Sequence, residues 1–255
     1  MYKEDLKRKF AEYIYSNYDM KDIGISRKYY HSLRVMDIAN LLAVNEKFNE
    51  NDIELSNIVG LLHDYGRFPQ WKNYKTYNDL ISIDHGDLAI KLLFENNEIE
   101  RFNIKHEYYD EIYDAIKYHN KLDITDDLSK HNKLLCKLIR DADKLDILYL
   151  YGTDMTLFKE DDKNISVEVK KSFYKNKQID KKIIKSKNDK ILLDLALVFD
   201  LNFNYSYKYI KDNKLIENLF KRLNNEELFK EYFEYIYEYV DEKNQEKKLT
   251  YIRKD

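Results

Sequence analysis

The chain has 255 residues, of which 44% are hydrophobic and 36% are charged. This composition is typical of one globular domain, or of one domain with an extension, and it excludes an intrinsically disordered protein. Five glycines and one proline are too few for a turn-rich all-β fold and favour a mostly helical one. The net charge of −3 gives no electrostatic basis for binding duplex nucleic acid.

Helical periodicity runs through the first 150 residues. Leu6, Phe10 and Ile14 mark a first helix, and Ser26 is a suitable cap for the second. Gly66 follows the third helix at a position suited to a left-handed C-terminal cap. The apolar stripes after the first helix predict helices over residues 26–44, 51–64, 82–95, 108–119 and 131–150. Residues 67–78 interrupt the pattern and contain the only proline and the only tryptophan, which predicts a loop.

The character of the sequence changes after Gly152. Residues 154–190 are highly charged and only weakly periodic. Further helices are predicted over residues 189–199, 205–223 and 226–242. We therefore predict an all-α protein with a helical core that carries the functional site over residues 1–152, and a helical C-terminal extension packed on that core over residues 153–255. The extension could shape a pocket or form a homodimer surface, and the sequence does not decide between these roles.

The sequence also predicts a cytoplasmic protein that does not contact membranes. Residues 1–10 are charged and lack the apolar core of a signal peptide. No segment approaches the ~18 consecutive apolar residues of a membrane span. The single cysteine, Cys136, excludes an internal disulfide, and its leucine neighbours predict a buried, unreactive thiol.

Six histidines and aspartates stand on the apolar faces of the predicted helices. Residues three and four apart share a helix face, so His31 points inward with Val35, and Asp141 points inward with Leu138 and Leu145. A buried charge is costly unless it is paired or bound to a metal. Imidazole and carboxylate groups suit Mn²⁺, Fe²⁺, Co²⁺ or Zn²⁺. We therefore predict a site for one or two divalent ions, held by His31, His63, Asp64, His85, His119 and Asp141.

Each of these residues has another explanation when it is taken alone. A single histidine on an apolar face is more often a hydrogen-bonded core residue, and Asp141 could form a buried ion pair with a nearby lysine or arginine. The joint occurrence of all six on inward faces favours the metal site, because the groups can offset one another's burial by sharing a cation.

The order of these residues resembles the HD superfamily of metal-dependent phosphohydrolases. The matching segments are HSLRV at His31, LLHDYGRF at His63, DHGDLAIKLL at His85, IKYHNK at His119 and RDADKLD at Asp141. The resemblance covers about residues 26–150 and implies an HD-domain helical bundle with additional C-terminal helices. It also implies two linked metal positions. One would be held by His31, His63, Asp64 and Asp141, and the other by Asp64, His85 and His119.

The same resemblance implies an activity. A metal-activated water would cleave a phosphomonoester or a phosphodiester, of a nucleotide or another small molecule, with Asp64 and Arg67 as catalytic residues. Arg67 stands three residues after Asp64, where related proteins often carry lysine or arginine, and it could bind phosphate as a planar fork. Its alternative role is an ion pair with a loop carboxylate. Arg34 and Lys144 are further candidate substrate contacts.

Departures from related enzymes narrow this expectation. Asn120 follows His119 where the cyclic-dinucleotide enzymes of the HD-GYP group have a second histidine, and no GYP motif occurs. Gly66, Arg67 and Phe68 occupy the region where guanosine tetraphosphate hydrolases carry an acidic pair. A small nucleotide or another compact phosphate ester remains the expected substrate. HD-fold di-iron oxygenases use the same ligands and are the alternative class, and a non-enzymatic binding module is the third.

Overall fold

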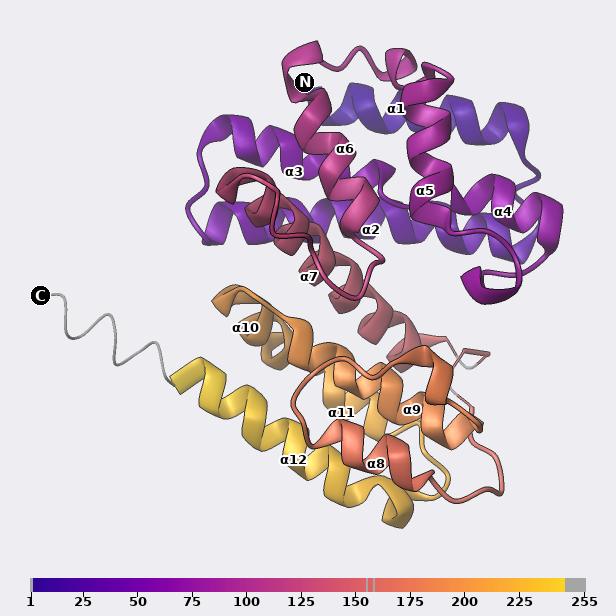
Figure 1. Cartoon of the computed structure of the whole chain (residues 1–255), viewed down its shortest axis with the longest axis vertical. Helices are drawn as coiled ribbons and strands as arrows, with labels where there is room; N and C mark the ends of the chain where they lie inside the picture. The colour runs from indigo at the N-terminus through magenta and orange to yellow at the C-terminus, as the bar shows by residue number, and fades with distance from the viewer. Residues whose placement is uncertain (1, 155, 158, 246–255) are drawn as a thin grey trace, which may run out of the picture. The chain divides into compact units, whose positions relative to one another are not determined.

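The computed structural model describes residues 2–154, 156–157 and 159–245, and these residues form helices and no strand (Figure 1). The prediction of an all-α fold is confirmed. The chain divides into two compact units, Met1–Asp143 and Lys144–Asp255. The division falls inside helix α7 (Lys130–Thr153), nine residues before the boundary that the sequence predicted. None of the described helices combines the length and hydropathy that crossing a membrane requires.

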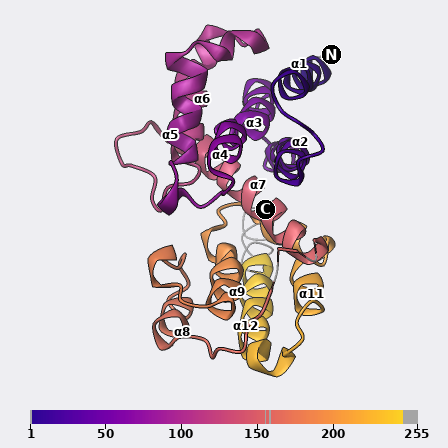
Figure 2. The same ribbon diagram turned by 90° about the vertical axis from the view of Figure 1, so that its right-hand side faces the viewer.

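The first unit is a bundle in which α2 packs against α3 and α5 packs against α6 (Figure 2). Its helices are α1 (Tyr2–Asn17), α2 (Ile23–Asn45), α3 (Glu50–Leu62), α4 (Arg67–Tyr74), α5 (His85–Ile90), α6 (Tyr109–Tyr118) and the first part of α7. Shorter 3₁₀ and π turns lie at Asp79–Ile81, Lys91–Glu95, Glu98–Phe102 and His106–Tyr108. Cys136 is buried as predicted, and burial raises the pKa of its thiol to about 12.

Side-chain caps set where α2 and α5 begin. Asp22, and not Ser26, caps α2 by accepting the N–H of Gly24 at 2.9 Å. Asp84 caps α5 in the same way, and this cap places His85 at the first residue of that helix. Cap residues of this kind satisfy backbone N–H groups that have no partner inside the helix. The predicted segment 82–95 therefore starts three residues too early.

The expectation of a loop over residues 67–78 is wrong for its first part, where α4 lies. Pro69 sits in the first turn of α4, where a backbone N–H has no intrahelical partner, so proline does not interrupt the helix. Gly66 is also not a left-handed cap, because its φ is −68°. A Cβ atom at Gly66 would lie 2.2 Å from the carbonyl oxygen of His85. Glycine is therefore needed there for the close approach of α5, and not for backbone conformation.

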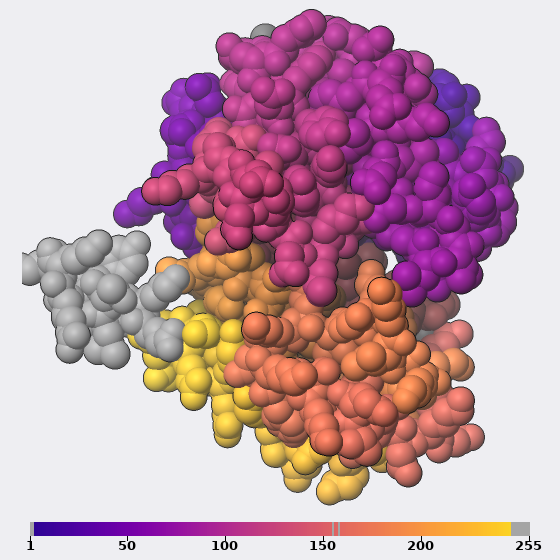
Figure 3. All heavy atoms as spheres, in the orientation of Figure 1, coloured from indigo at the N-terminus to yellow at the C-terminus, as the bar shows by residue number. Residues whose placement is uncertain are grey.

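The described residues of the second unit form the rest of α7 and five further helices. These are α8 (Val167–Phe173), α9 (Lys187–Leu195), α10 (Asn204–Asp212), α11 (Leu215–Phe220) and α12 (Glu226–Gln245), with 3₁₀ turns at Lys181–Ile183 and Ala196–Asp200. The predicted single helix over 205–223 is two helices, separated at Lys214, whose φ of 51° ends the first. Helix α12 packs against α10 and α11, and α8 packs against α9. Figure 3 shows the same face as Figure 1 with all heavy atoms, where side chains cover the helices of each unit.

Candidate metal centre

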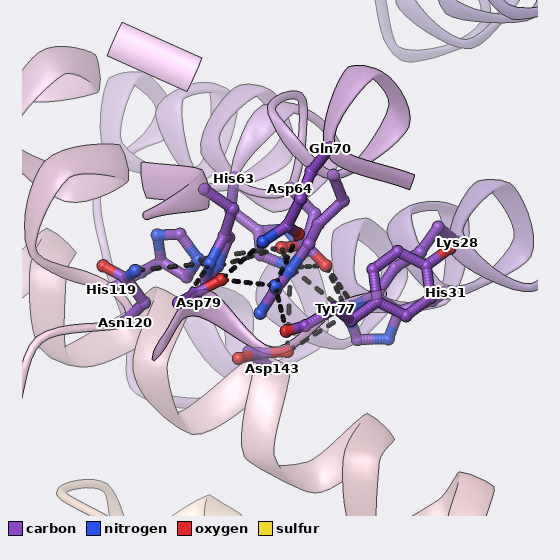
Figure 4. Close-up of polar contacts among 12 residues, drawn as sticks. Lys28, His31, His63, Asp64, Gln70, Tyr77, Asp79, His119, Asn120 and Asp143 are labelled. Carbon is purple, nitrogen blue, oxygen red and sulfur yellow. Dashed lines mark hydrogen bonds and ion pairs between the residues drawn. The ribbon is translucent and has the colours of Figure 1, made fainter. Parts of the chain in front are cut away.

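Two histidines and an aspartate converge on one point inside the first unit (Figure 4). His31 lies in the middle of α2, while His63 and Asp64 directly follow the last residue of α3. The Nε2 atoms of His31 and His63 are 3.3 Å apart, and both face Oδ2 of Asp64, at 3.3 and 3.4 Å. All three side chains are buried. Their ligand atoms lie close enough together to bind one metal ion.

A second group uses the other oxygen of Asp64. His85 begins α5 and His119 caps the end of α6. Their Nε2 atoms are 2.9 Å apart and lie 3.3 and 3.8 Å from Oδ1 of Asp64. These residues also form a buried group that could hold a metal. Asp64 thus stands between two histidine pairs and offers one oxygen to each.

In three of these rings, the nitrogen that faces away from the site, Nδ1, already donates a hydrogen bond. Nδ1 of His63 and of His119 donate to the carbonyl oxygens of Gly60 and Ile116, at 2.8 and 2.6 Å. Nδ1 of His85 donates to the Asp79 carboxylate at 2.7 Å. A neutral imidazole has one N–H, so Nε2 of each ring carries a lone pair that points into the site. Lone pairs that approach within 2.9 Å repel each other unless a proton or a metal ion lies between them.

The distances between donor atoms match a bound ion. When each donor lies ~2.0–2.2 Å from a metal, neighbouring donors of a tetrahedral or octahedral shell are about 2.8–3.6 Å apart. The distances from His31, His63 and Asp64 fall in this range. Those around His85 also do, and only the contact from His119 to Asp64, at 3.8 Å, is longer. The residues present therefore fit one or two divalent ions.

Electrostatics hold Asp64 and His85 in the forms that bind metals, whereas the carboxylates of Asp64 and Asp143 outweigh the burial of His63 and raise its pKa. Burial raises the pKa of the Asp64 carboxyl, but the charges of Lys28 and His63 outweigh this effect and hold that pKa well below its usual range. Burial, together with the nearby Arg67, lowers the pKa of His85 to about 3. An ionised carboxylate and a neutral imidazole are the metal-binding forms of these side chains.

The aspartate that α7 contributes is Asp143, and the prediction of Asp141 requires correction. Oδ1 of Asp143 lies 3.1 Å from Nε2 of His31 and 3.6 Å from Nε2 of His63. Asp143 therefore offers a fourth ligand atom to the group formed by His31, His63 and Asp64, here called the first pocket; the group of Asp64, His85 and His119 is the second pocket. Residues two positions apart on a helix point about 200° apart, so Asp141 cannot face the same point as Asp143. Asp141 is fully buried on another side of α7.

The predicted substrate contacts have different surroundings. Arg67 borders the site, with Nε 3.5 Å from Oδ1 of Asp64, and it forms the loop ion pair that was its alternative role, to Asp79 at 2.8 Å. Lys144 is buried and forms an ion pair with Asp200 at 2.7 Å. Arg34 is half-buried on α2. Contact of Arg34 or Lys144 with a substrate stays a prediction.

Two further charged residues border the ligands and were not predicted. Lys28 Nζ lies 2.5 Å from Oδ2 of Asp64. Asp79 accepts from His85, from Arg67 and from the side-chain amide of Gln70. Lys28 stands three residues before a predicted ligand on the same helix, and this spacing could have identified it. Asp79 lies in a connecting segment without periodicity, where the sequence carries no such signal.

Comparisons with known proteins give one match. The family model for the HD domain matches residues 29–148, a range that contains all four clustered histidines together with Asp64 and Asp143. No curated protein and no solved structure matches the chain. The matched segment and the buried histidine–aspartate cluster within it together identify residues 29–148 as an HD domain.

Proposed function

We propose that this chain is a metal-dependent phosphohydrolase that uses water to cleave a phosphate ester of a nucleotide or another small molecule. HD domains belong mostly to metal-dependent hydrolases. The observation that carries the proposal is Asp64, whose two oxygens face two separate histidine pairs inside a buried site. Two divalent ions held in this way would activate water and neutralise phosphoryl oxygens.

Arg67 supports a phosphoryl substrate. Its Nη1 atom donates to Gln70, to the carbonyl of Tyr77 and to Asp79, and these bonds fix the guanidinium in place. Its Nη2 atom forms no hydrogen bond with the described residues, and its Nε atom is buried without a hydrogen-bond partner. Arg67 therefore keeps N–H groups beside Asp64 that could donate hydrogen bonds to a phosphoryl oxygen. The scissile P–O bond would break as water forms a new P–O bond, and the leaving alcohol would gain a proton.

The test is metal analysis combined with a substrate screen. Protein purified without chelator should contain one to two equivalents of a transition metal. Phosphomonoesters, nucleotides and cyclic dinucleotides would then be screened for phosphate or alcohol release, in parallel under air and under argon. We expect release at equal rates in both atmospheres, and no release with Asp64→Ala as the control.

Two results would contradict the proposal. Turnover that stops under argon and consumes O₂ under air would show that the chain is an HD-fold oxygenase, which needs the same ligands. Metal-loaded protein that releases no product from any ester of the screen and binds no inorganic phosphate would show that the site does not act on phosphates.

A further inference from the structure

Lys28 is the cation closest to the metal ligands. It lies on α2, three residues before His31, so that both side chains are on one face of the helix. Its Nζ atom is 2.5 Å from Oδ2 of Asp64, and the side chain is only 16% exposed. Figure 4 shows Lys28 at the His31 end of the cluster, away from His119.

Lys28 and Arg67 lie next to different oxygens of Asp64. Lys28 contacts the oxygen that faces the first pocket, and Arg67 approaches the oxygen that faces the second. Both cations also lie near the ring of Tyr77, at 5.4 and 5.6 Å from its centroid. The ring is held in place because it stacks on Trp71 at 4.6 Å and because its hydroxyl donates to the carbonyl of Gly24. The two cations therefore have fixed positions on either side of the shared ligand.

An ammonium group in this position opposes metal binding. Lys28 competes for the charge of the oxygen that the first pocket needs, and like charges in a buried site repel each other strongly. Three carboxylates, Asp64, Asp79 and Asp143, and two cations, Lys28 and Arg67, lie at the metal ligands, so the protein charge there is nearly balanced. Two divalent ions would make the site strongly positive. Such a site favours a doubly charged anion over a singly charged one.

From this arrangement we propose that Lys28 is a substrate-binding residue that holds a phosphoryl oxygen on the first-pocket side, opposite Arg67. The pair would select phosphomonoester dianions over phosphodiester monoanions. This inference rests on the proposed phosphohydrolase function and names its substrate class. An anion bound between Lys28 and the metal positions would also relieve the repulsion between them.

The test measures metal binding and phosphate binding separately on metal-loaded protein. Lys28→Met removes the charge and keeps the length of the side chain. We expect its metal content to equal or exceed that of the wild type, because a competing cation is gone. Its affinity for inorganic phosphate, measured by titration calorimetry, should fall by about tenfold or more, the usual effect of losing one charge-assisted hydrogen bond. Affinity for dimethyl phosphate should fall less.

Two variants provide controls. Lys28→Arg keeps the charge and should restore part of the phosphate affinity. Lys75→Met removes another lysine that forms an ion pair with an aspartate, Asp22, at 2.8 Å, but Lys75 is 64% exposed. It should bind metal and phosphate as the wild type does.

Different results would overturn different statements. If the wild type binds phosphate and Lys28→Met binds it equally well, the role of Lys28 is wrong while the proposed function stands. If Lys28→Met loses metal as well as phosphate, Lys28 is only the structural partner of Asp64, and the inference is again wrong. If the metal-loaded wild type binds no phosphate, the proposed function fails and the inference fails with it.

Discussion

Both units of the chain bury aspartates, but they use them in opposite ways. In the second unit, Asp189 accepts the N–H and hydroxyl of Ser166 and the N–H of Lys185, at 2.7, 2.7 and 2.9 Å. Each of these partners is a hydrogen-bond donor, so the carboxylate is satisfied by the fold itself. In the first unit, Asp64 faces histidine nitrogens, and two of these rings have given their only N–H to backbone carbonyls.

This difference shows what distinguishes a chemical site from a structural one. Burial is complete in both cases, because Asp189 and Asp64 are 0% and 2% exposed. The partners differ, since Asp189 meets hydrogen-bond donors of the fold, whereas Asp64 meets Lys28 at one oxygen and, at both oxygens, imidazole nitrogens whose lone pairs need a cation. Among the groups of described residues that could hold a metal, both contain Asp64 and neither lies in the second unit.

The largest effect should come from Asp64→Ala, which removes the ligand shared by both pockets. We expect turnover to fall by about 10³-fold or more, or ~4 kcal/mol in activation free energy. Metal content, measured by elemental analysis, should fall with it. His85→Ala and His119→Ala should lose mainly the second metal, and unchanged metal content in these two variants would indicate a mononuclear site.

The next effect separates the two aspartates of α7. Asp143→Ala removes a carboxylate ligand atom that lies 3.1 Å from His31. It should lower the metal affinity by more than roughly 10–100-fold, which is the usual effect of removing a residue that only hydrogen-bonds to a metal ligand. Asp141→Ala should keep the metal and lower the unfolding free energy by about 1–3 kcal/mol, because it leaves buried polar partners unpaired. Metal titration and thermal unfolding of both variants would check this. The reverse pattern would restore Asp141 as the ligand.

A smaller effect is expected for Arg67→Ala. Loss of its free donors should reduce kcat/KM by about 10²-fold, or ~2.7 kcal/mol, with the metals retained. Arg67→Lys should recover part of the loss, because it restores the charge without the planar fork. The measurement needs a substrate from the screen. Wild-type turnover combined with lower thermal stability would mean that Arg67 serves only its ion pair with Asp79.

The smallest functional effect should follow from Asp189→Ala in the second unit. Metal content should not change, while the unfolding free energy should fall by about 1–3 kcal/mol through the lost hydrogen bonds. Burial raises the pKa of Asp189, but its bonds to Ser166 and Lys185 lower it below the ordinary value. The unfolded chain therefore binds the proton more readily.

The pH dependence of this effect follows from that direction. The stabilisation by Asp189 is complete above the unfolded pKa of about 3.9 and is lost as the pH falls through the lower folded value. Denaturant unfolding at pH 7 and at pH 3 should show a smaller difference between the wild type and Asp189→Ala at the lower pH. Loss of metal from this variant would contradict the separation of roles between the two units.

The sequence predicted the helices well where apolar residues recur regularly, and less well where tertiary contacts decide. The predicted segment 26–44 lies within α2, and the segment 108–119 nearly coincides with α6. Helix α4 was missed because its buried residues are few, Phe68 and Gln70, and Gln70 is held by hydrogen bonds to Asp79, Ser82 and Ile83 from outside the helix. Short helices of this kind depend on such contacts more than on periodicity.

By itself, the sequence determined that four histidines and Asp64 face inward, because helix periodicity fixes the direction of each side chain. The spacing to Leu138 and Leu145 selected Asp141, whereas Asp143 is the aspartate that lies against His31. Residues 138–142 and 144–146 of α7 are all buried, so this part of the helix has no exposed face from which to read a direction. Only the tertiary structure decided that Asp143 meets His31, that Lys28 contacts Asp64 and that Asp79 borders the ligands. Charge interactions depend on distances through space, and residues such as Lys28 and Asp64, 36 positions apart, acquire theirs only when the helices pack.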